Sequence, residues 1–285
     1  MTHALNPHLS HSKRHFQRDG FVILPHLIPE AELVPVRHAI HRLVEEHDIS
    51  RHRSVFRTDD QDQGRDELFF ASASTVQGFL EAAALDEQGA LQVPASRCLN
   101  KIGHALHDLV PEFTDLARST WVREAFTVGG LSQTKIIQSM VIFKQPQIGG
   151  EVRWHQDASY LISQPSSVVG VWIALEDATQ ENGCLWMVPG AHRGPLRERY
   201  QVDWSERTGA LKTIDRTPWP TMEEATAIEV PAGSVVVFHD HMPHRSFANS
   251  SARSRLAVTF HGHDLSSSWA LNNWLQRPEL ADFII

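Results

Sequence analysis

A histidine and an aspartate stand two residues apart in the stretch RWHQDASYL, at His155 and Asp157. On an extended strand, residues i and i+2 project to the same face about 7 Å apart, so both side chains can reach one ion. An imidazole and a carboxylate, completed by a second histidine, form the two-histidine, one-carboxylate set of non-haem Fe(II) oxygenases. The alternative is two polar residues on the solvent side of a strand, because so short a pattern also occurs by chance.

A second stretch, FHDHMPHRSFANSSARSRLAVTFH at 238–261, offers three histidines as the remaining ligand: His239, His241 and His244. A hairpin with its tip near residues 249–250 would place His244 opposite Arg255, with Ser246 on the same face. A buried arginine needs an anion, and its planar fork suits a carboxylate. The hairpin therefore predicts a patch that binds a metal at one end and a small carboxylate at the other.

The competing interpretation places both arginines of this stretch, Arg253 and Arg255, on an exposed edge strand, with the histidines in turns. Two residues two apart share a face, so both arginines would lie inside or both outside. A bulge or twist near the hairpin tip would be needed to separate them.

The elements that must position these residues change character along the chain. Segment 29–47 carries an apolar stripe typical of a helix, and a second helical block is expected at about 97–129. The β-branched run at 20–25 predicts a strand. The polar segment 50–67 predicts a long surface loop, which we regard as a candidate lid.

From about residue 134 onward, short β-rich runs alternate with Pro, Gly and Asn, a pattern typical of a sandwich or barrel. The polar segment 195–225 predicts a long connection. We therefore expect a single domain over 1–285, with a helical part at about 1–130 and a β core at about 131–270. The runs that we expect to form strands are 134–144, 168–177, 183–188, 234–239, 244–248 and 255–261.

Composition restricts the function classes. The chain has 285 residues, of which 41% are hydrophobic, enough for a sizeable buried core. Its net charge is -8 with no long basic run, which argues against a nucleic-acid partner. Two distant cysteines, no apolar leader and no run long enough to span a bilayer lead us to expect a cytoplasmic location.

Three motifs together, HQD at 155–157, ENGCLWMVPGAH at 181–192 and PHRSFANSSARSR at 243–255, resemble the phytanoyl-CoA dioxygenase family of Fe(II)/2-oxoglutarate oxygenases. The likeness continues upstream through FQRDGFVIL, NKIGHALHDLVPEF and QSMVIFKQPQIGGEV, and is weakest at 50–97 and 195–230. The resemblance implies a mainly β fold. Its core would be a double-stranded β-helix, the cupin-like jelly roll, buttressed by N-terminal α-helices.

The resemblance also implies roles for individual residues. Iron would be held by His155, Asp157 and His244. Arg255, eleven positions beyond His244, would hold the far carboxylate of 2-oxoglutarate with help from Ser246. Positions that line the co-substrate in the family fall at Lys101, Met140 and Trp172.

Each of these assignments has a structural alternative. Lys101 could be a solvated helix residue, Met140 and Trp172 could simply pack the core, and Ser246 could cap a turn. The other histidines of the region, at 239, 241, 261 and 263, are expected to be structural or exposed rather than ligands. Asp157 disfavours halogenation, because related halogenases carry a small residue there.

The implied activity uses Fe(II), 2-oxoglutarate and O2 to hydroxylate or otherwise oxidise an unactivated C–H bond of a small molecule, with release of succinate and CO2. A lipid, an acyl-CoA and a natural product all stay open as substrates, and the sequence does not indicate an oligomeric state. Two alternatives are a cupin-like metal protein that works without 2-oxoglutarate and a non-catalytic jelly roll. The first leaves Arg255 and Ser246 without a purpose, and the second does not explain an intact ligand set.

Overall fold

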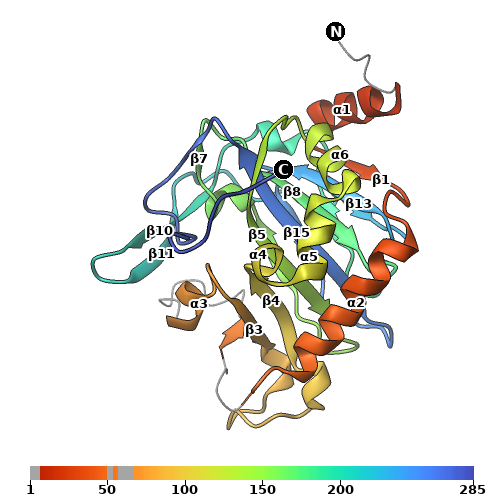
Figure 1. Cartoon of the computed structure of the whole chain (residues 1–285), viewed down its shortest axis with the longest axis vertical. Coiled ribbons are helices and arrows are strands. Elements are labelled where there is room, and N and C mark those ends of the chain that lie inside the picture. Colours follow the sequence, from red (N-terminus) through yellow and green to blue (C-terminus); the bar gives the residue numbers. More distant parts are fainter. Residues whose placement is uncertain (1–6, 50–53, 57–66) are drawn as a thin grey trace.

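Two sheets packed face to face form the centre of the molecule in this computed structural model, which describes residues 7–49, 54–56 and 67–285. Figure 1 shows the larger of the two. The larger sheet is almost wholly antiparallel and runs β1-β13-β8-β15-β5-β4-β3-β2, with β17 paired to β5. Its strands are β1 (Phe21–Leu24), β2 (Val55–Phe56), β3 (Val76–Glu81), β4 (Leu99–His104), β5 (Thr134–Lys144), β8 (Val169–Ala174), β13 (Val235–His239), β15 (Arg255–Asp264) and β17 (Phe283–Ile284).

The smaller sheet runs β12-β9-β14-β6 and lies against one face of the larger one. Its strands are β6 (Val152–His155), β9 (Leu185–Met187), β12 (Thr226–Ile228) and β14 (His244–Ser246). Short ladders join β7 (Ser163–Gln164) to β16 (Ser268–Trp269) and β10 (Glu198–Asp203) to β11 (Thr208–Thr213). This arrangement confirms the expected mainly β, jelly-roll fold.

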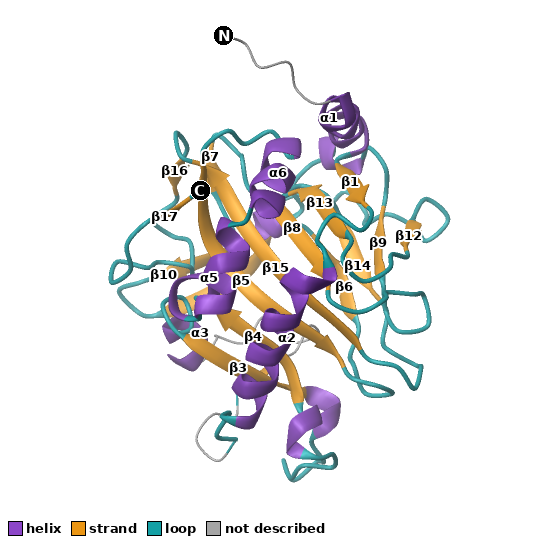
Figure 2. Cartoon of the chain, turned by 45° about the vertical axis from the view of Figure 1, so that its right-hand side comes forward, coloured by secondary structure: helices purple, strands orange, loops and turns teal. Residues whose placement is uncertain are grey.

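Helices cover the outer face of the larger sheet, as Figure 2 shows for α2, α5 and α6. The predicted stripe of α2 packs inward, since Leu33, Val36 and Ile40 are buried against the sheet. Ser119 caps α6 by accepting a hydrogen bond from the Val122 backbone N–H at 3.3 Å. The helices are α1 (Pro7–Asp19), α2 (Glu30–Glu45), α3 (Glu67–Ala71), α4 (Leu106–Leu109), α5 (Pro111–Arg118) and α6 (Thr120–Val128).

The two faces of strand β15 lie in different surroundings, one under the helices and one between the two sheets. Val258 and Phe260 belong to the core beneath the helices, whereas Ala257 belongs to the core between the two sheets. Side chains alternate along a strand, so the residues at 255, 259 and 261 share the inner face with Ala257. The inner face of β15 therefore carries polar residues into the space between the sheets.

The expected helical block at 97–129 is wrong at its start. Leu99–His104 is strand β4, hydrogen-bonded between β3 and β5, and helix begins only at Leu106. Its apolar residues also fit a helical spacing, but pairing with two neighbouring strands decides the outcome. The part of the chain before residue 130 thus adds strands to the larger sheet as well as helices.

Two other expectations concern connecting segments. Segment 195–225 contains the hairpin β10–β11, which projects to the left of Figure 1. Trp204 in its turn packs on Phe70 with ring centroids 5.5 Å apart and donates its indole N–H to the Asn273 carbonyl at 3.2 Å.

The candidate lid at 50–67 lies mostly outside the described residues and stays a prediction. None of the helices in the described ranges has the length and apolarity to cross a bilayer.

Candidate active site

His155 and Asp157 lie at the end of β6, where the strand gives way to a 3-10 turn. His155 is the last residue of the strand and Asp157 begins the turn, with an extended Gln156 between them (φ -124°, ψ 134°). The chain thus stays extended across the pair although the strand has ended. Both side chains therefore lie on one side, with His155 Nε2 3.8 Å from Asp157 Oδ1.

His244 completes the group from β14, which is inserted between β6 and β9. It is paired with His155 across the ladder, and their ring centroids are 4.1 Å apart. His244 Nε2 lies 3.7 Å from Asp157 Oδ1. The candidate ligand atoms of these three residues all lie within 4.8 Å of one another, and no other His, Cys, Asp or Glu group in the described ranges does so.

Backbone carbonyls orient both imidazole rings. The Nδ1–H of His155 donates to the Arg153 carbonyl at 3.0 Å, and that of His244 donates to the Met242 carbonyl at 2.9 Å. Because Nδ1 carries the proton in each ring, the Nε2 lone pairs point to the centre of the group. Burial lowers the pKa of His155 to about 4, and the His244 ring adds to this effect. The neutral ring is the form that binds a metal.

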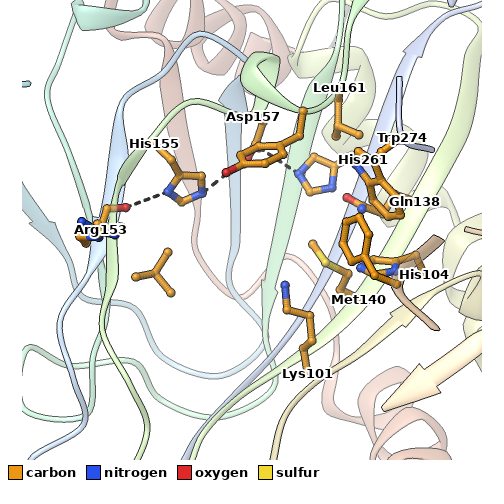
Figure 3. A pocket seen from close by; sticks show the side chains of 13 residues that line it. Lys101, His104, Gln138, Met140, Arg153, His155, Asp157, Leu161, His261 and Trp274 are labelled. Carbon is orange, nitrogen blue, oxygen red and sulfur yellow. Dashed lines mark hydrogen bonds and ion pairs between the residues drawn. The ribbon is translucent and has the colours of Figure 1, made fainter. Parts of the chain in front are cut away.

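The Asp157 carboxylate is held from its other side by His261 on β15. His261 Nε2 lies 2.9 Å from Asp157 Oδ2, so the two oxygens have different neighbours (Figure 3). Burial acts to raise the pKa of Asp157, but the neighbouring histidines, His261 first, together lower it below its usual range. The carboxylate is therefore ionised, as a metal ligand must be.

His261 is expected to be structural or exposed rather than a ligand, and it is indeed buried and outside the ligand group, although it contacts Asp157 and lines the cavity. The signal was present in the strand pattern, since position 261 shares the inner face with Arg255. Its cross-strand partner Gln138 also lines the site, and no local pattern distinguishes this glutamine from others in strands.

Gln156 fixes the backbone between the two ligands of β6. Its side chain is fully buried and its amide nitrogen donates to the carbonyls of Pro195 and His241, at 3.1 and 2.9 Å. Its amide oxygen accepts from the Arg197 backbone N–H at 3.1 Å. Gln156 thus ties the pair to two distant loops, on the face opposite the ligands.

Arg255 lies inside the sandwich on β15, with 2% of its surface exposed. Its guanidinium carbon is 5.5 Å from the centre of the Trp172 ring, and Nε and Nη1 have no hydrogen-bond partner. Lys144, its cross-strand neighbour, donates to the carbonyls of Gly150 and Phe247. Burial lowers the pKa of Arg255 and the nearby Glu176 acts to raise it, but no carboxylate of the described residues forms an ion pair with the guanidinium. A buried cation without a direct anionic partner is costly, which marks this end of the interior as an anion site.

The expected hairpin between His244 and Arg255 is wrong. β14 and β15 belong to different sheets, so the two residues approach across the interior and not along one ladder. Arg253 lies in the turn before β15 and is exposed, 3.6 Å from Asp177 Oδ2. The two arginines are separated because the strand starts at Arg255, and no bulge is involved.

A cavity of about 130 Å³ opens beside the ligand group (Figure 3). Of the residues that the sequence singled out, Lys101 and Met140 line it with His155 and Asp157, and Lys101 lies on β4 and not on a helix. Trp172 and Ser246 are buried but are not among the residues that line this cavity. The other lining residues are Phe69, His104, Gln138, Val152, Arg153, Tyr160, Leu161, His261 and Trp274.

Comparison with known proteins gives a consistent result. The sequence model described as phytanoyl-CoA dioxygenase matches residues 16–257. Phytanoyl-CoA dioxygenase domain-containing protein 1 from Bos taurus is 38% identical over 273 residues, covering 93% of this chain and 94% of its own. Its Caenorhabditis briggsae homolog is 36% identical, covering 96% and 98%.

Solved structures show the same fold at low sequence identity. EctD from S. alaskensis, in its apoform, aligns with a TM-score of 0.64 at 18% identity, covering 98% of this chain and 84% of its own. The non-heme alpha ketoglutarate dependent carbocyclase SnoK from nogalamycin biosynthesis aligns with a TM-score of 0.61 at 21% identity, covering 92% and 86%.

Proposed function

Because the chain belongs to the phytanoyl-CoA dioxygenase family, we propose that it oxidises an unactivated C–H bond of a small molecule in an Fe(II)- and 2-oxoglutarate-dependent reaction. One observation carries the proposal. A largely buried two-histidine, one-carboxylate group lies at one part of the interior, and the guanidinium of Arg255, whose Nε and Nη1 have no hydrogen-bond partner, lies at another. The first suits a divalent metal and the second suits a carboxylate.

The donor set fits iron. Two imidazole nitrogens and one carboxylate oxygen on one side of an ion form a facial set that leaves positions open for exogenous ligands. The ligands His155, Asp157 and His244 would therefore hold Fe(II) and leave room for a bidentate co-substrate. When bound, iron and 2-oxoglutarate supply the oxidising chemistry, in which O2 is consumed and succinate and CO2 are released.

The chain's own residues orient and isolate these groups. Arg255 would hold the far carboxylate of 2-oxoglutarate through its planar fork, with Trp172 beside it and Ser246 opposite on β14. Lys101 and Met140 would line the co-substrate from β4 and β5. Burial between the two sheets keeps water from the reacting groups, which protects an oxidation from side reactions.

The cavity lining supports a small substrate with both apolar and polar groups. Phe69, Leu161 and Trp274 supply apolar surface, while Gln138 and His261 supply hydrogen-bonding groups near the metal ligands. We propose a lipid, an acyl-CoA or a natural product as the substrate class. Relatives are named for phytanoyl-CoA and for nogalamycin biosynthesis, which are consistent with these classes.

Anaerobic titration with Fe(II) and then 2-oxoglutarate tests the proposal. We expect a visible metal-to-ligand charge-transfer band in the native protein that is lost in Asp157→Ala. Metallated protein without such a band would contradict the proposal and favour a cupin-like metal protein that works without 2-oxoglutarate. Failure to bind Fe(II) would favour a non-catalytic jelly roll. Substrate-stimulated succinate release, measured across the three compound classes, then identifies the substrate.

A further inference from the structure

Thr259 stands on β15 between the two parts of the proposed site. It lies four residues after Arg255 and two before His261, and its direct cross-strand neighbours are Met140 on β5 and Trp172 on β8. Only 3% of its surface is exposed, and its hydroxyl oxygen has no hydrogen-bond partner. A buried polar atom of this kind needs an explanation, because most such atoms in folded proteins are satisfied.

The hydroxyl and the guanidinium of Arg255 flank the same indole. Thr259 shares the inner face of β15 with Ala257 and Arg255, by the alternation of the strand. The Arg255 side chain reaches along the strand toward Trp172, with its guanidinium carbon 5.5 Å from the ring centre. Trp172 is also the direct neighbour of Thr259. Both unsatisfied donors therefore adjoin one region between the sheets.

A threonine at this position is costly unless something accepts its hydrogen bond. Valine has nearly the same shape and would fill the position without a buried hydroxyl. An anion bound to Arg255 would bring carboxylate oxygens next to Trp172 and so within reach of the Thr259 side chain. A hydroxyl that is unsatisfied in the free protein and satisfied in the complex is the pattern expected of a binding residue.

We propose that Thr259 is a binding residue for the dicarboxylate co-substrate, with its hydroxyl donating a hydrogen bond to the carboxylate that Arg255 holds. This inference rests on the proposed function. It adds a donor from the larger sheet to the one that Ser246 offers from the smaller sheet, so that both sheets would contact the same carboxylate.

The test compares Thr259→Val with the native protein by calorimetry, with N-oxalylglycine, an unreactive analogue of 2-oxoglutarate, as the probe and Mn(II) as the metal. We expect N-oxalylglycine to bind about tenfold more weakly to Thr259→Val, the usual effect of losing one hydrogen bond to a charged group. Thr259→Ser, which keeps the hydroxyl, should bind within about twofold of the native protein. Mn(II) affinity without the analogue should be unchanged in all three.

Thermal unfolding supplies a second, independent readout. Removal of an unsatisfied buried hydroxyl should leave the melting temperature of the metal-free protein equal or higher, while the rise on adding Mn(II) and N-oxalylglycine should shrink. A threonine with a purely structural role would instead lower the melting temperature of Thr259→Val without the analogue. Thr134→Val is the matched control, since Thr134 is equally buried at the far end of β5, and its analogue binding should not change.

The outcomes separate this inference from the proposed function. If the native protein binds N-oxalylglycine and Thr259→Val binds it equally well, the role of Thr259 is excluded and the proposed function stands. A weakening in Thr134→Val as large as that in Thr259→Val would exclude the role too. If native Mn(II)-loaded protein fails to bind N-oxalylglycine, both the proposed function and the role of Thr259 are contradicted.

Discussion

His261 donates from Nε2 to Oδ2 of Asp157 over 2.9 Å, while Oδ1 of the same carboxylate faces His155 and His244. The two oxygens thus have separate neighbours: Oδ2 contacts His261 of the larger sheet, and Oδ1 faces the two histidines of the smaller sheet. Such a division orients the carboxylate for binding a metal through Oδ1 alone. Groups that orient metal ligands in this way affect metal binding strongly, although they do not touch the metal.

Replacing His261 should therefore weaken metal binding. We expect His261→Leu to lower the affinity for Fe(II) or Co(II) by about 10- to 100-fold, the usual cost of losing a partner that orients a ligand. Anaerobic metal titration measures it. His263→Leu is the control, because His263 is about equally buried on the same strand. Its ring stacks on Trp269, whereas His261 forms the hydrogen bond to Asp157. Equal affinities in the two variants would refute this role.

Replacing Arg255 should weaken co-substrate binding without affecting the metal. A lysine cannot reproduce the two parallel hydrogen bonds of the guanidinium, so we expect Arg255→Lys to bind N-oxalylglycine on the order of 100-fold more weakly. Arg253→Lys, on an exposed arginine two residues away, should bind it normally. A loss of Mn(II) affinity in Arg255→Lys would contradict this prediction, because it would show that the substitution disturbs the metal site as well.

Gln156 should be important for stability. Gln156→Leu leaves the His241 carbonyl and the buried Arg197 N–H without this partner, while the Pro195 carbonyl keeps the Nη1 of Arg197 as a donor. We therefore expect the free energy of unfolding to fall by about 3 kcal/mol. Urea denaturation of the metal-free protein measures the change. Gln180→Leu, which removes an exposed amide, should alter it by less than about 0.5 kcal/mol. A neutral effect of Gln156→Leu would show that the loops position themselves without it.

Lys144 should make stability depend on alkaline pH. Burial, and then the charge of Arg255, lowers the pKa of Lys144 to about 7 from 10.5. Between these values the unfolded chain binds the proton and the folded chain does not, so stability rises with pH in this window. Relative to Lys144→Met, the native protein should gain stability from pH 7 to pH 9 in urea denaturation. Lys212→Met, on the exposed hairpin, should show no such difference in slope.

The sequence predicted the strands of the core well because their apolar runs are short and sharply bounded. β5, β8 and β13 each fall within an expected run, and β15 begins with its expected run at Arg255 but extends beyond residue 261 to Asp264. Leu99–His104 was assigned to a helix because its apolar residues fit both a helical and a strand spacing. It forms a strand because it pairs with β3 on one side and β5 on the other. Such pairing partners are far away in the chain and cannot be read from local spacing.

The site was predictable in its residue types and less so in its geometry. The extended backbone from His155 to Asp157 brings their side chains together, as the i, i+2 spacing predicted. Alternation alone grouped Arg253 with Arg255, whereas only Arg255 is buried. The spacing of His244 and Arg255 also fitted a hairpin, which was wrong because the loop between them crosses from one sheet to the other. The role of Gln138 was missed, since a glutamine in a strand gives no sign of the cavity that it faces. The bonds of Gln156 to two distant loops were also not predictable, because those loops are far away in the sequence.

The place of β14 between β6 and β9 has a consequence for how the protein acquires its metal. His155 and Asp157 are synthesised well before His244, yet the three meet only once β14 has joined its ladder. A newly made chain therefore offers an incomplete binding group until this late strand is inserted. Iron loading would then select chains that have finished folding, and a chain that stalls earlier would hold the metal weakly and release it.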